Sequence, residues 1–453
     1  MTTRLPTRFQ TVQLHIGIDD TDSTKGGCTT YIAARLVEKL TSLGGVRFTD
    51  YPNIIRLNPN IPYKTRGNAA VALRVEIQRT LYDVVQETAL DEIETGSHIG
   101  QKGTDPAVVI LMGHPTPEIK QFSRKALCDV LSERDAVKLV RSSGASAAAY
   151  GTELGLVGAL AAVGQTLTQD HTFELIAYRR KENCGSPRQV DEASVVRMDK
   201  MTSPQTFNNY DYENKRMLIA PHGPDPVLFG IRGENAEIVT EAFRMVEVRE
   251  PVERWAVFRT NHGTDAHLRV LTENSEVKPN RPAVLRGVVS GRPNRIPGGH
   301  VFFDLSAIGR TFTCAAYEPT GQFRETIANL LLGDVVTVYG GVRESAKGRS
   351  VTINLEKILI HQLVDKVRIE NPTCPVCGKR LKSAGRRQGY RCEKCSLKMP
   401  DSTKRTTTEM RPIGTGLYVP TPKAHRHLTK PLCRYGQEKV WDHHPAIGRW
   451  HRP

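Results

Sequence analysis

The stretch VQLHIGIDDTDSTKGGCTT, residues 12–30, decides the fold of the N-terminal part of the chain. Residues 12–19 alternate and then become apolar, which is typical of a strand that enters a core. The strand ends in the acidic turn 19–22, DDTD, and a loop of small residues follows. Over residues 29–43 the apolar side chains return at helical spacing. The stretch therefore predicts strand, polar loop and helix, an arrangement that often places a ligand at the helix N-terminus.

The acidic turn is the first candidate site. Its three carboxylates repel one another unless a cation lies between them, and Mg²⁺ bound to a nucleoside triphosphate combines carboxylate ligands with phosphate oxygens. Backbone N–H groups of the glycine loop and the helix start would face the phosphates. The alternative is a structural turn whose Thr caps the helix, because the P-loop spacing is absent. The predicted ATP and Mg²⁺ ligands here are Asp19, Asp20, Asp22, Lys25, Gly26, Gly27 and Thr29.

A basic loop, RLNPNIPYKTRGN at residues 56–68, precedes the next predicted strand. It gathers Lys64, Arg66 and Asn68 into a short segment. Cations and amides on a rigid loop can neutralise the charge that develops in phosphoryl transfer. We therefore add these three residues to the predicted ATP site. A surface loop with solvated charges is the alternative.

The chain of 453 residues is long enough for several domains, and its patterns predict a multidomain α+β protein. Residues 1–196 are predicted as one mixed α/β domain and residues 197–280 as a small ferredoxin-like α+β domain. Residues 281–365 contain five β-rich runs with a helix after the third, the order of an OB-fold; another small β-barrel is the alternative. Residues 366–400 hold the cysteine module. Residues 401–453 form a basic tail with little periodicity, which we expect to be partly disordered when unbound.

Four of the nine cysteines form a metal-binding pattern. Their spacing is Cys-x2-Cys-x14-Cys-x2-Cys, and four thiolates in two knuckles match tetrahedral Zn²⁺ with no open position. The predicted zinc site is therefore structural, in a zinc ribbon whose surrounding lysines and arginines suit nucleic acid. The alternative is a folding module whose basic residues only aid solubility. The predicted ligands are Cys374, Cys377, Cys392 and Cys395.

Charge separates the two ends of the chain. The net charge is +15, and residues 365–453 alone hold 20 Lys or Arg against 7 Asp or Glu. This predicts catalysis in the front and polyanion binding in the back, unless the basic tail only aids solubility. No apolar run long enough to span a membrane is present, and none follows the basic N-terminus, which predicts no membrane partner and a cytoplasmic protein. A non-catalytic RNA-binding scaffold and a small-molecule kinase with an RNA module are the alternative functions.

Taken together, the motifs resemble one archaeal family, the tRNA(Ile) agmatidine synthases or 2-agmatinylcytidine synthetases. The likeness covers roughly residues 12–396, in the family's order. It rests on GIDDTD (17–22) with GCTT (27–30), the basic loop (56–68), GLVGALAAVG (155–164), ELIAYR (174–179), LFGIRGE (228–234), TNH (260–262), GGHVFF (298–303), CAAYEP (314–319) and the cysteine knuckles.

The resemblance implies a kinase-like domain, a ferredoxin-like domain, an OB-fold and a zinc ribbon. It implies that ATP activates carbon 2 of the wobble cytidine in an isoleucine tRNA with a CAU anticodon. Agmatine then displaces the activated oxygen, so that the tRNA reads AUA codons. It further implies that Thr29 is phosphorylated and that Asp19 and Asp20 are the metal and ATP carboxylates. ATP, Mg²⁺, Zn²⁺, agmatine and tRNA are the expected ligands and partners.

Overall fold

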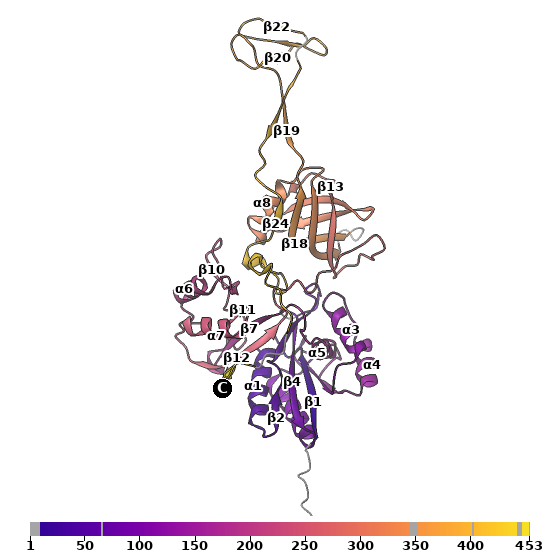
Figure 1. Ribbon diagram of the computed structural model, residues 1–453, viewed down its shortest axis with the longest axis vertical. Coiled ribbons are helices and arrows are strands. Elements are labelled where there is room, and N and C mark those ends of the chain that lie inside the picture. Colours follow the sequence, from indigo (N-terminus) through magenta and orange to yellow (C-terminus); the bar gives the residue numbers. More distant parts are fainter. Residues whose placement is uncertain (1–9, 65–66, 345–350, 401–402, 442–445, 453) are drawn as a thin grey trace, which may run out of the picture.

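The computed structural model describes residues 10–64, 67–344, 351–400, 403–441 and 446–452. Figure 1 shows a broad part built on a large sheet, a β-barrel above it and a slender ribbon at the top. None of the helices in these ranges is long and apolar enough to cross a membrane.

One sheet of eleven strands contains ten strands from the first 260 residues and one strand from the C-terminus, which pairs with β12. β3 and β12 pair in parallel at its centre, with Asn53 opposite Arg259, and join its two halves. β7 lies between β12 and β11, so the sheet has no break at the domain boundary predicted at residue 196. In order along the sheet the strands are β6 (Ser146–Ala149), β5 (Ala107–Met112), β1 (Thr11–Asp19), β4 (Ala69–Gln78), β3 (Asn53–Arg56), β12 (Val252–Thr260), β7 (Thr172–Arg179), β11 (Val227–Gly233) and β8 (Thr206–Phe207), with β2 (Val46–Phe48) on β4 and β25 (His451–Arg452) on β12.

Helices cover both faces of the sheet. Leu14, Ile16 and Ile18 of β1 pack in the same core as α1 (Thr29–Ser42) and α2 (Tyr82–Gly96). Because side chains alternate along a strand, the residues between them face the opposite helices. Those helices are α3 (Pro117–Ala126), α4 (Glu133–Ser143) and α5 (Gly155–Gly164), while α6 (Glu192–Thr202) and α7 (Ala236–Met245) pack in the core of the other half, near the hairpin of β9 (Tyr210–Asp211) and β10 (Arg216–Met217).

The barrel confirms the predicted OB-fold. Five strands close on themselves in the order β13-β17-β18-β16-β15, and β13 also pairs with β15. An α-helix, α8, lies between the third and fourth barrel strands, as the sequence predicts. The elements are β13 (Pro282–Val289), β15 (Val301–Ala307) with β14 (Asn294–Arg295) beside it, β16 (Arg310–Ala316), α8 (Phe323–Ala328), β17 (Val335–Glu344) and β18 (Val351–Gln362).

A two-stranded stalk carries the cysteine module away from the barrel (Figure 1). β19 (Lys366–Glu370) pairs along its length with β23 (Arg405–Glu409). Val367 and Ile369 of this stalk are largely exposed. The small sheet of β20 (Lys382–Ser383), β21 (Tyr390–Arg391) and β22 (Lys398–Met399) forms its tip.

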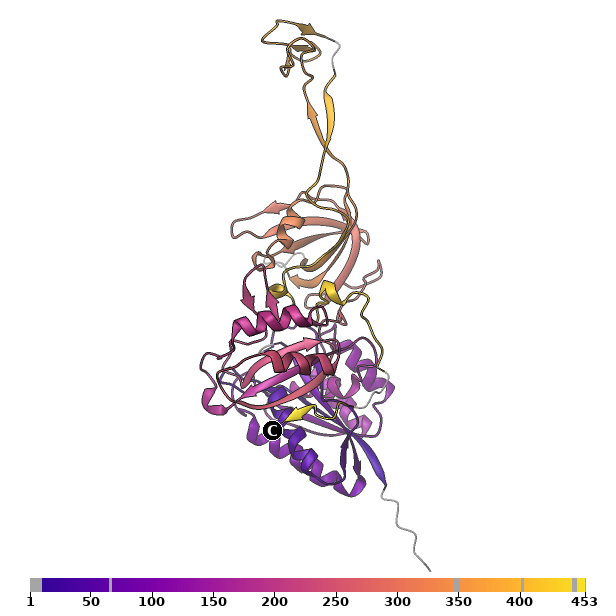
Figure 2. The ribbon, with the colours of Figure 1, turned by 60° about the vertical axis from the view of Figure 1, so that its left-hand side comes forward.

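After the stalk the chain returns to the sheet as a segment that we call the C-terminal strap, residues 416–441 and 446–452. β24 (Gly416–Tyr418) pairs with β18 of the barrel, and β25 pairs with β12 of the sheet. Figure 2 shows this yellow segment descending from the barrel to the C-terminus beside the sheet. The expectation of a partly disordered tail is therefore wrong for these residues.

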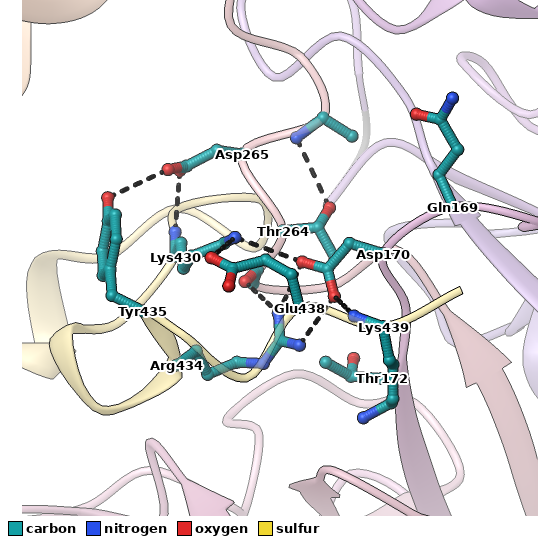
Figure 3. Close-up of polar contacts among 12 residues, drawn as sticks. Gln169, Asp170, Thr172, Thr264, Asp265, Lys430, Arg434, Tyr435, Glu438 and Lys439 are labelled. Atoms are coloured by element: carbon teal, nitrogen blue, oxygen red, sulfur yellow. Dashed lines mark hydrogen bonds and ion pairs between the residues drawn. The ribbon is translucent and has the colours of Figure 1, made fainter. Parts of the chain in front are cut away.

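Buried ion pairs fix the strap, as Figure 3 shows. Arg434 is fully buried, and its guanidinium lies 3.0 Å from the Asp170 carboxylate. The same guanidinium contacts Glu234 at 2.5 Å. Lys430 lies 3.2 Å from the same Asp170 carboxylate. Basic residues of the predicted polyanion-binding tail thus neutralise carboxylates that lie next to β7 and β11.

Candidate active site

The acidic turn lies at the end of β1, with its first carboxylate pressed against α5. Asp19 follows the alternation of β1 and points to the α5 side. An added Cβ at Gly158 would overlap the Asp19 carboxylate, and one at Gly17 would overlap the backbone of Ala159. Small residues on both elements therefore allow the strand and the helix to come close enough to half-bury Asp19 between them.

The electrostatics of the turn favour a cation. Burial, followed by the charge of Asp20, raises the pKa of Asp19 well above its ordinary value. Burial raises the pKa of Asp20 to about 7, and the charges of Asp105 and Asp22 add to this effect, while the hydrogen bond from the Asp105 backbone N–H opposes it. A divalent cation between the carboxylates would reverse this repulsion and restore the charged forms. Carboxylate oxygens in such a cluster are the donor set that Mg²⁺ prefers.

Thr29 lies beside these carboxylates, at the first position of α1. Asp22 Oδ1 accepts a hydrogen bond from the Thr29 backbone N–H at 2.9 Å, and the Thr29 hydroxyl lies 3.4 Å from the same oxygen. Thr21 Oγ1 donates to Thr29 Oγ1 at 3.0 Å. The Thr29 hydroxyl is thus held in a fixed position at the helix N-terminus, where negative phosphate groups are stabilised.

A pocket opens over the turn and brings together residues from both predicted segments. Lys64 and Asn68 of the basic loop face the acidic turn across it. Burial and the nearby charges of Arg426 and Arg343 lower the pKa of Lys64 to about 8. The lining residues are Asp19, Asp20, Asp22, Thr29, Leu57, Ile61, Tyr63, Lys64, Asn68, Ala69, Ala126, Asp129, Leu131, Leu154, Gly155, Val157 and Gly158.

Four predicted site residues are not in this lining. Lys25, Gly26 and Gly27 lie in a tight turn closed by a 3.0 Å hydrogen bond from the Ser23 N–H to the Gly26 carbonyl. Gly26 and Gly27 have positive φ angles, so this turn needs glycine for its own conformation. Arg66 lies outside the described residues.

Sequence reasoning missed Asp105, which supports the turn from a neighbouring segment. Its backbone N–H donates to Asp20 Oδ2 at 3.2 Å, and Thr104 Oγ1 donates to the Asp22 carbonyl at 2.9 Å. Asp105 precedes β5, and β5 pairs with β1 so that Asp19 lies opposite Ala107. Only the pairing of these two strands identifies Asp105, because nothing in its local sequence marks it.

The four cysteines of the knuckles meet at the tip of the stalk. Their sulfur atoms all lie within 4.8 Å of one another, and Cys377 Sγ is 3.6 Å from Cys392 Sγ. The Cys395 backbone N–H donates to Cys392 Sγ at 3.3 Å, a contact that stabilises a thiolate. Four converging sulfurs fit one tetrahedral Zn²⁺, so the residues present suit the predicted ion.

Comparison with known proteins matches all four parts of the chain. Family models match the TiaS TCKD domain at residues 15–81, the TiaS FLD domain at 153–267, an OB-fold nucleic acid binding domain at 283–360 and the TiaS C-terminal zinc ribbon at 371–413.

Curated relatives match over nearly the whole chain. The tRNA 2-agmatinylcytidine synthetase TiaS of Methanosarcina mazei, which acts on an isoleucine tRNA, is 42% identical over 92% of this chain and 97% of the relative. The enzyme of the same name from Methanocaldococcus jannaschii is 41% identical over 93% of this chain and 98% of the relative.

Solved structures agree with the relatives. A complex of TiaS with its isoleucine tRNA and ATP matches with a TM-score of 0.85 at 40% identity, over 93% of this chain and 97% of that one. A complex of TiaS with the same tRNA, AMPCPP and agmatine matches with a TM-score of 0.82 at 38% identity and the same coverage.

Proposed function

The chain belongs to the TiaS family of tRNA 2-agmatinylcytidine synthetases, and from this membership we propose the reaction that it catalyses. It is an ATP-dependent tRNA-modifying enzyme that attaches agmatine to carbon 2 of the wobble cytidine. Its RNA substrate is the isoleucine tRNA with a CAU anticodon, and the product decodes AUA. The cytoplasm, where tRNA and ATP meet, is its proposed location.

The chemistry requires activation of a poor leaving group. The oxygen on carbon 2 of cytidine does not leave as such, but once it carries a phosphoryl group it departs with that group. The amine of agmatine then forms the new C–N bond and loses a proton, while the C–O bond to carbon 2 breaks. The observation that carries this proposal is the juxtaposition of three half-buried carboxylates and the buried Thr29 hydroxyl in one pocket.

The site residues take complementary roles in this proposal. Asp19, Asp20 and Asp22 would hold Mg²⁺, which neutralises phosphate charge when bound. Thr29, by likeness to the family, accepts a phosphoryl group, and Asp22 keeps its hydroxyl in place. Lys64 and Asn68 face the phosphates from the opposite wall. Lys25, Gly26, Gly27 and Arg66 stay proposed phosphate ligands from the two flanking loops.

The RNA must present an unstacked base to this pocket. In an anticodon loop this step costs little free energy, because the bases of the loop are not paired. The OB-fold lies above the large sheet and the zinc ribbon extends beyond it, and we assign to these two domains the grip on the rest of the tRNA (Figure 1).

A product assay tests the proposal. Purified protein is incubated with ATP, Mg²⁺, agmatine and a CAU-anticodon tRNA transcript, and the digested nucleosides are analysed by mass spectrometry. The wild type should give a modified wobble cytidine, while Asp20→Ala and Thr29→Ala should give none. Thr41→Ala, a matched control at the far end of the same helix, should retain the product, because its hydroxyl only donates to the Val37 carbonyl.

Two outcomes oppose the proposal. Tight tRNA binding without any product would favour a non-catalytic RNA-binding scaffold. ATP turnover that needs no tRNA and leaves it unmodified would favour a small-molecule kinase.

A further inference from the structure

A second cavity lies next to the active-site pocket, where three distant segments of the chain meet. It has a volume of about 430 Å³ and shares Leu57 and Lys64 with the first pocket. The end of β3 and the basic loop form one wall, β17 of the barrel another, and the C-terminal strap the third. The lining residues are Arg56, Leu57, Pro59, Lys64, Gly67, Arg343, His425, Arg426, His427 and Leu428.

The charges of this cavity are almost all of one sign. Four of the ten lining residues are Lys or Arg, two are His, and none of these ten is Asp or Glu. Two of the arginines are paired with carboxylates that are not among the lining residues: Glu174 is 3.4 Å from Arg56, and Glu356 is 3.4 Å from Arg426. Arg56 Nε is buried and has no hydrogen-bond partner in the described part of the chain.

The positive potential also acts on the histidines. The charge of Arg56, with burial, lowers the pKa of His427 well below its ordinary value, so this ring is neutral. The neutral ring adds no further charge to the cavity and offers a ring nitrogen to a ligand. The cavity is therefore built to receive an anion, and the dicationic agmatine is excluded from it by repulsion.

Asn60 holds the three walls together. Arg343 Nη1 donates to the Asn60 carbonyl at 2.8 Å, and Arg426 Nη1 donates to Asn60 Oδ1 at 2.5 Å. Asn60 packs so closely on Gly341 that an added Cβ there would overlap its side-chain amide. The two guanidinium groups are thus fixed by the same buried residue and face the cavity from different segments.

We propose that this cavity binds a phosphate group of the tRNA backbone next to the nucleotide that is modified. Arginine guanidinium groups match the geometry of phosphate oxygens, and fixed ones lose little entropy when they bind. Leu57 and Lys64 line both cavities, so the second cavity lies directly beside the active-site pocket. A nucleotide whose base enters the active-site pocket would therefore have its backbone phosphate close to the second cavity. The inference rests on the proposed function, since it names the part of the RNA that this region holds.

The test measures tRNA affinity against salt concentration, together with ATP affinity by calorimetry. The double variant R343Q/R426Q should weaken tRNA binding about tenfold or more, because charged hydrogen bonds to phosphate are lost. It should also reduce the slope of log K against log salt concentration by about 1, the value for one lost phosphate contact. The ATP Kd should stay unchanged.

Control variants separate charge from structure. R343K/R426K keeps both charges and should retain most of the salt slope, while Arg47→Gln, an exposed arginine of β2 paired with Glu76, should match the wild type. If the double Gln variant does not fold, the single variants Arg343→Gln and Arg426→Gln serve instead. Each single variant keeps the hydrogen bond from the other guanidinium to Asn60. Either single variant should weaken tRNA binding severalfold.

The outcomes are distinct. A raised ATP Kd with an unchanged tRNA salt slope would show that the cavity holds a phosphate of ATP, which overturns the proposal. No change in either quantity would also overturn it. Both readouts are binding measurements, so a wild type that binds tRNA through this cavity but forms no modified cytidine would refute the proposed function and leave the phosphate site standing.

Discussion

At the scale of single residues, the site depends on how closely Asp19 approaches α5. Asp19 is half-buried against α5 because Gly158 has no side chain, and this desolvation raises the pKa of Asp19. A desolvated carboxylate that repels its neighbours is unfavourable for the unliganded fold. The same arrangement favours a bound cation. The unliganded fold is therefore destabilised at the place where the proposed chemistry needs a positive charge.

The first prediction concerns Gly158→Ala. The added methyl group overlaps the Asp19 carboxylate, so either the carboxylate or α5 must move. Because displacement of a proposed metal ligand by about 1 Å is costly for catalysis, we expect the rate of product formation to fall about 100-fold. Single-turnover assays with saturating ATP and tRNA measure it. Gly44→Ala is the matched control, since an added Cβ there has nothing within 4 Å; equal rates for the two variants would contradict the prediction.

A second prediction concerns the pH dependence of stability. Burial alone would raise the pKa of Glu356, but His267 and Arg426 overcome this effect and lower it from 4.5 to about 2. Because the folded pKa lies below the unfolded one, the carboxylate stabilises the fold above pH 4.5, and this contribution is lost as the pH falls towards 2. The shift corresponds to at most about 3 kcal/mol.

Urea unfolding between pH 6 and pH 2.5 checks this prediction. Glu356→Gln should lose less stability over that range than the wild type does, because the glutamine does not titrate. Glu273→Gln, at an exposed position, should follow the wild-type curve. Parallel curves for Glu356→Gln and the wild type would count against the assigned role of Glu356.

At the scale of elements, the zinc ribbon and its stalk stand apart from the other cores. The tip buries only Cys374, Leu381 and Cys392 in a cluster of its own, and the two stalk strands are mostly exposed. Such a small cluster cannot hold a fold by itself, so the metal must supply the stability of the tip.

Metal removal should therefore act on this element alone. Chelation of Zn²⁺, or Cys374→Ser, should unfold the tip while the unfolding midpoint of the sheet and barrel stays within about 2 °C of the untreated protein. Hydrogen exchange resolved by segment measures both effects. We expect ATP affinity to be unchanged and tRNA affinity to fall. Cooperative unfolding of the whole chain on chelation would refute the independence of the tip.

At the scale of the whole molecule, sequence reasoning succeeds where a pattern is local. The strand and acidic turn of residues 12–22, the five-strand order of the barrel and the cysteine spacing are each contained in one continuous stretch of the chain, and the structure has all three. Pairings between remote segments leave no such pattern. β3 and β12 join in parallel although about 200 residues separate them, so composition cannot reveal that the two predicted domains share a sheet.

The same limit explains the strap and the second cavity. The partners of Arg434 are Asp170 and Glu234, which lie 264 and 200 positions away along the chain. Arg56, Arg343 and Arg426 likewise come from three segments that are remote along the chain, and they meet only in the folded cavity. A basic tail in the sequence is therefore compatible with a solvated segment or with a buried strap, and only the positions of the opposing carboxylates decide between them.

The last prediction tests whether the strap is an integral part of the fold. Arg434→Gln leaves the partly buried carboxylates of Asp170 and Glu234 without their main cation, although Lys430 and Lys439 stay close. Removal of one partner from a buried ion pair costs about 3–5 kcal/mol, so the free energy of unfolding measured in urea should fall by that amount at neutral pH. Arg449→Gln, at an exposed position of the same strap, should change it by less than about 0.5 kcal/mol. Equal stability of the two variants would mean that the strap is only loosely docked, and the third wall of the phosphate cavity would then have to come from elsewhere.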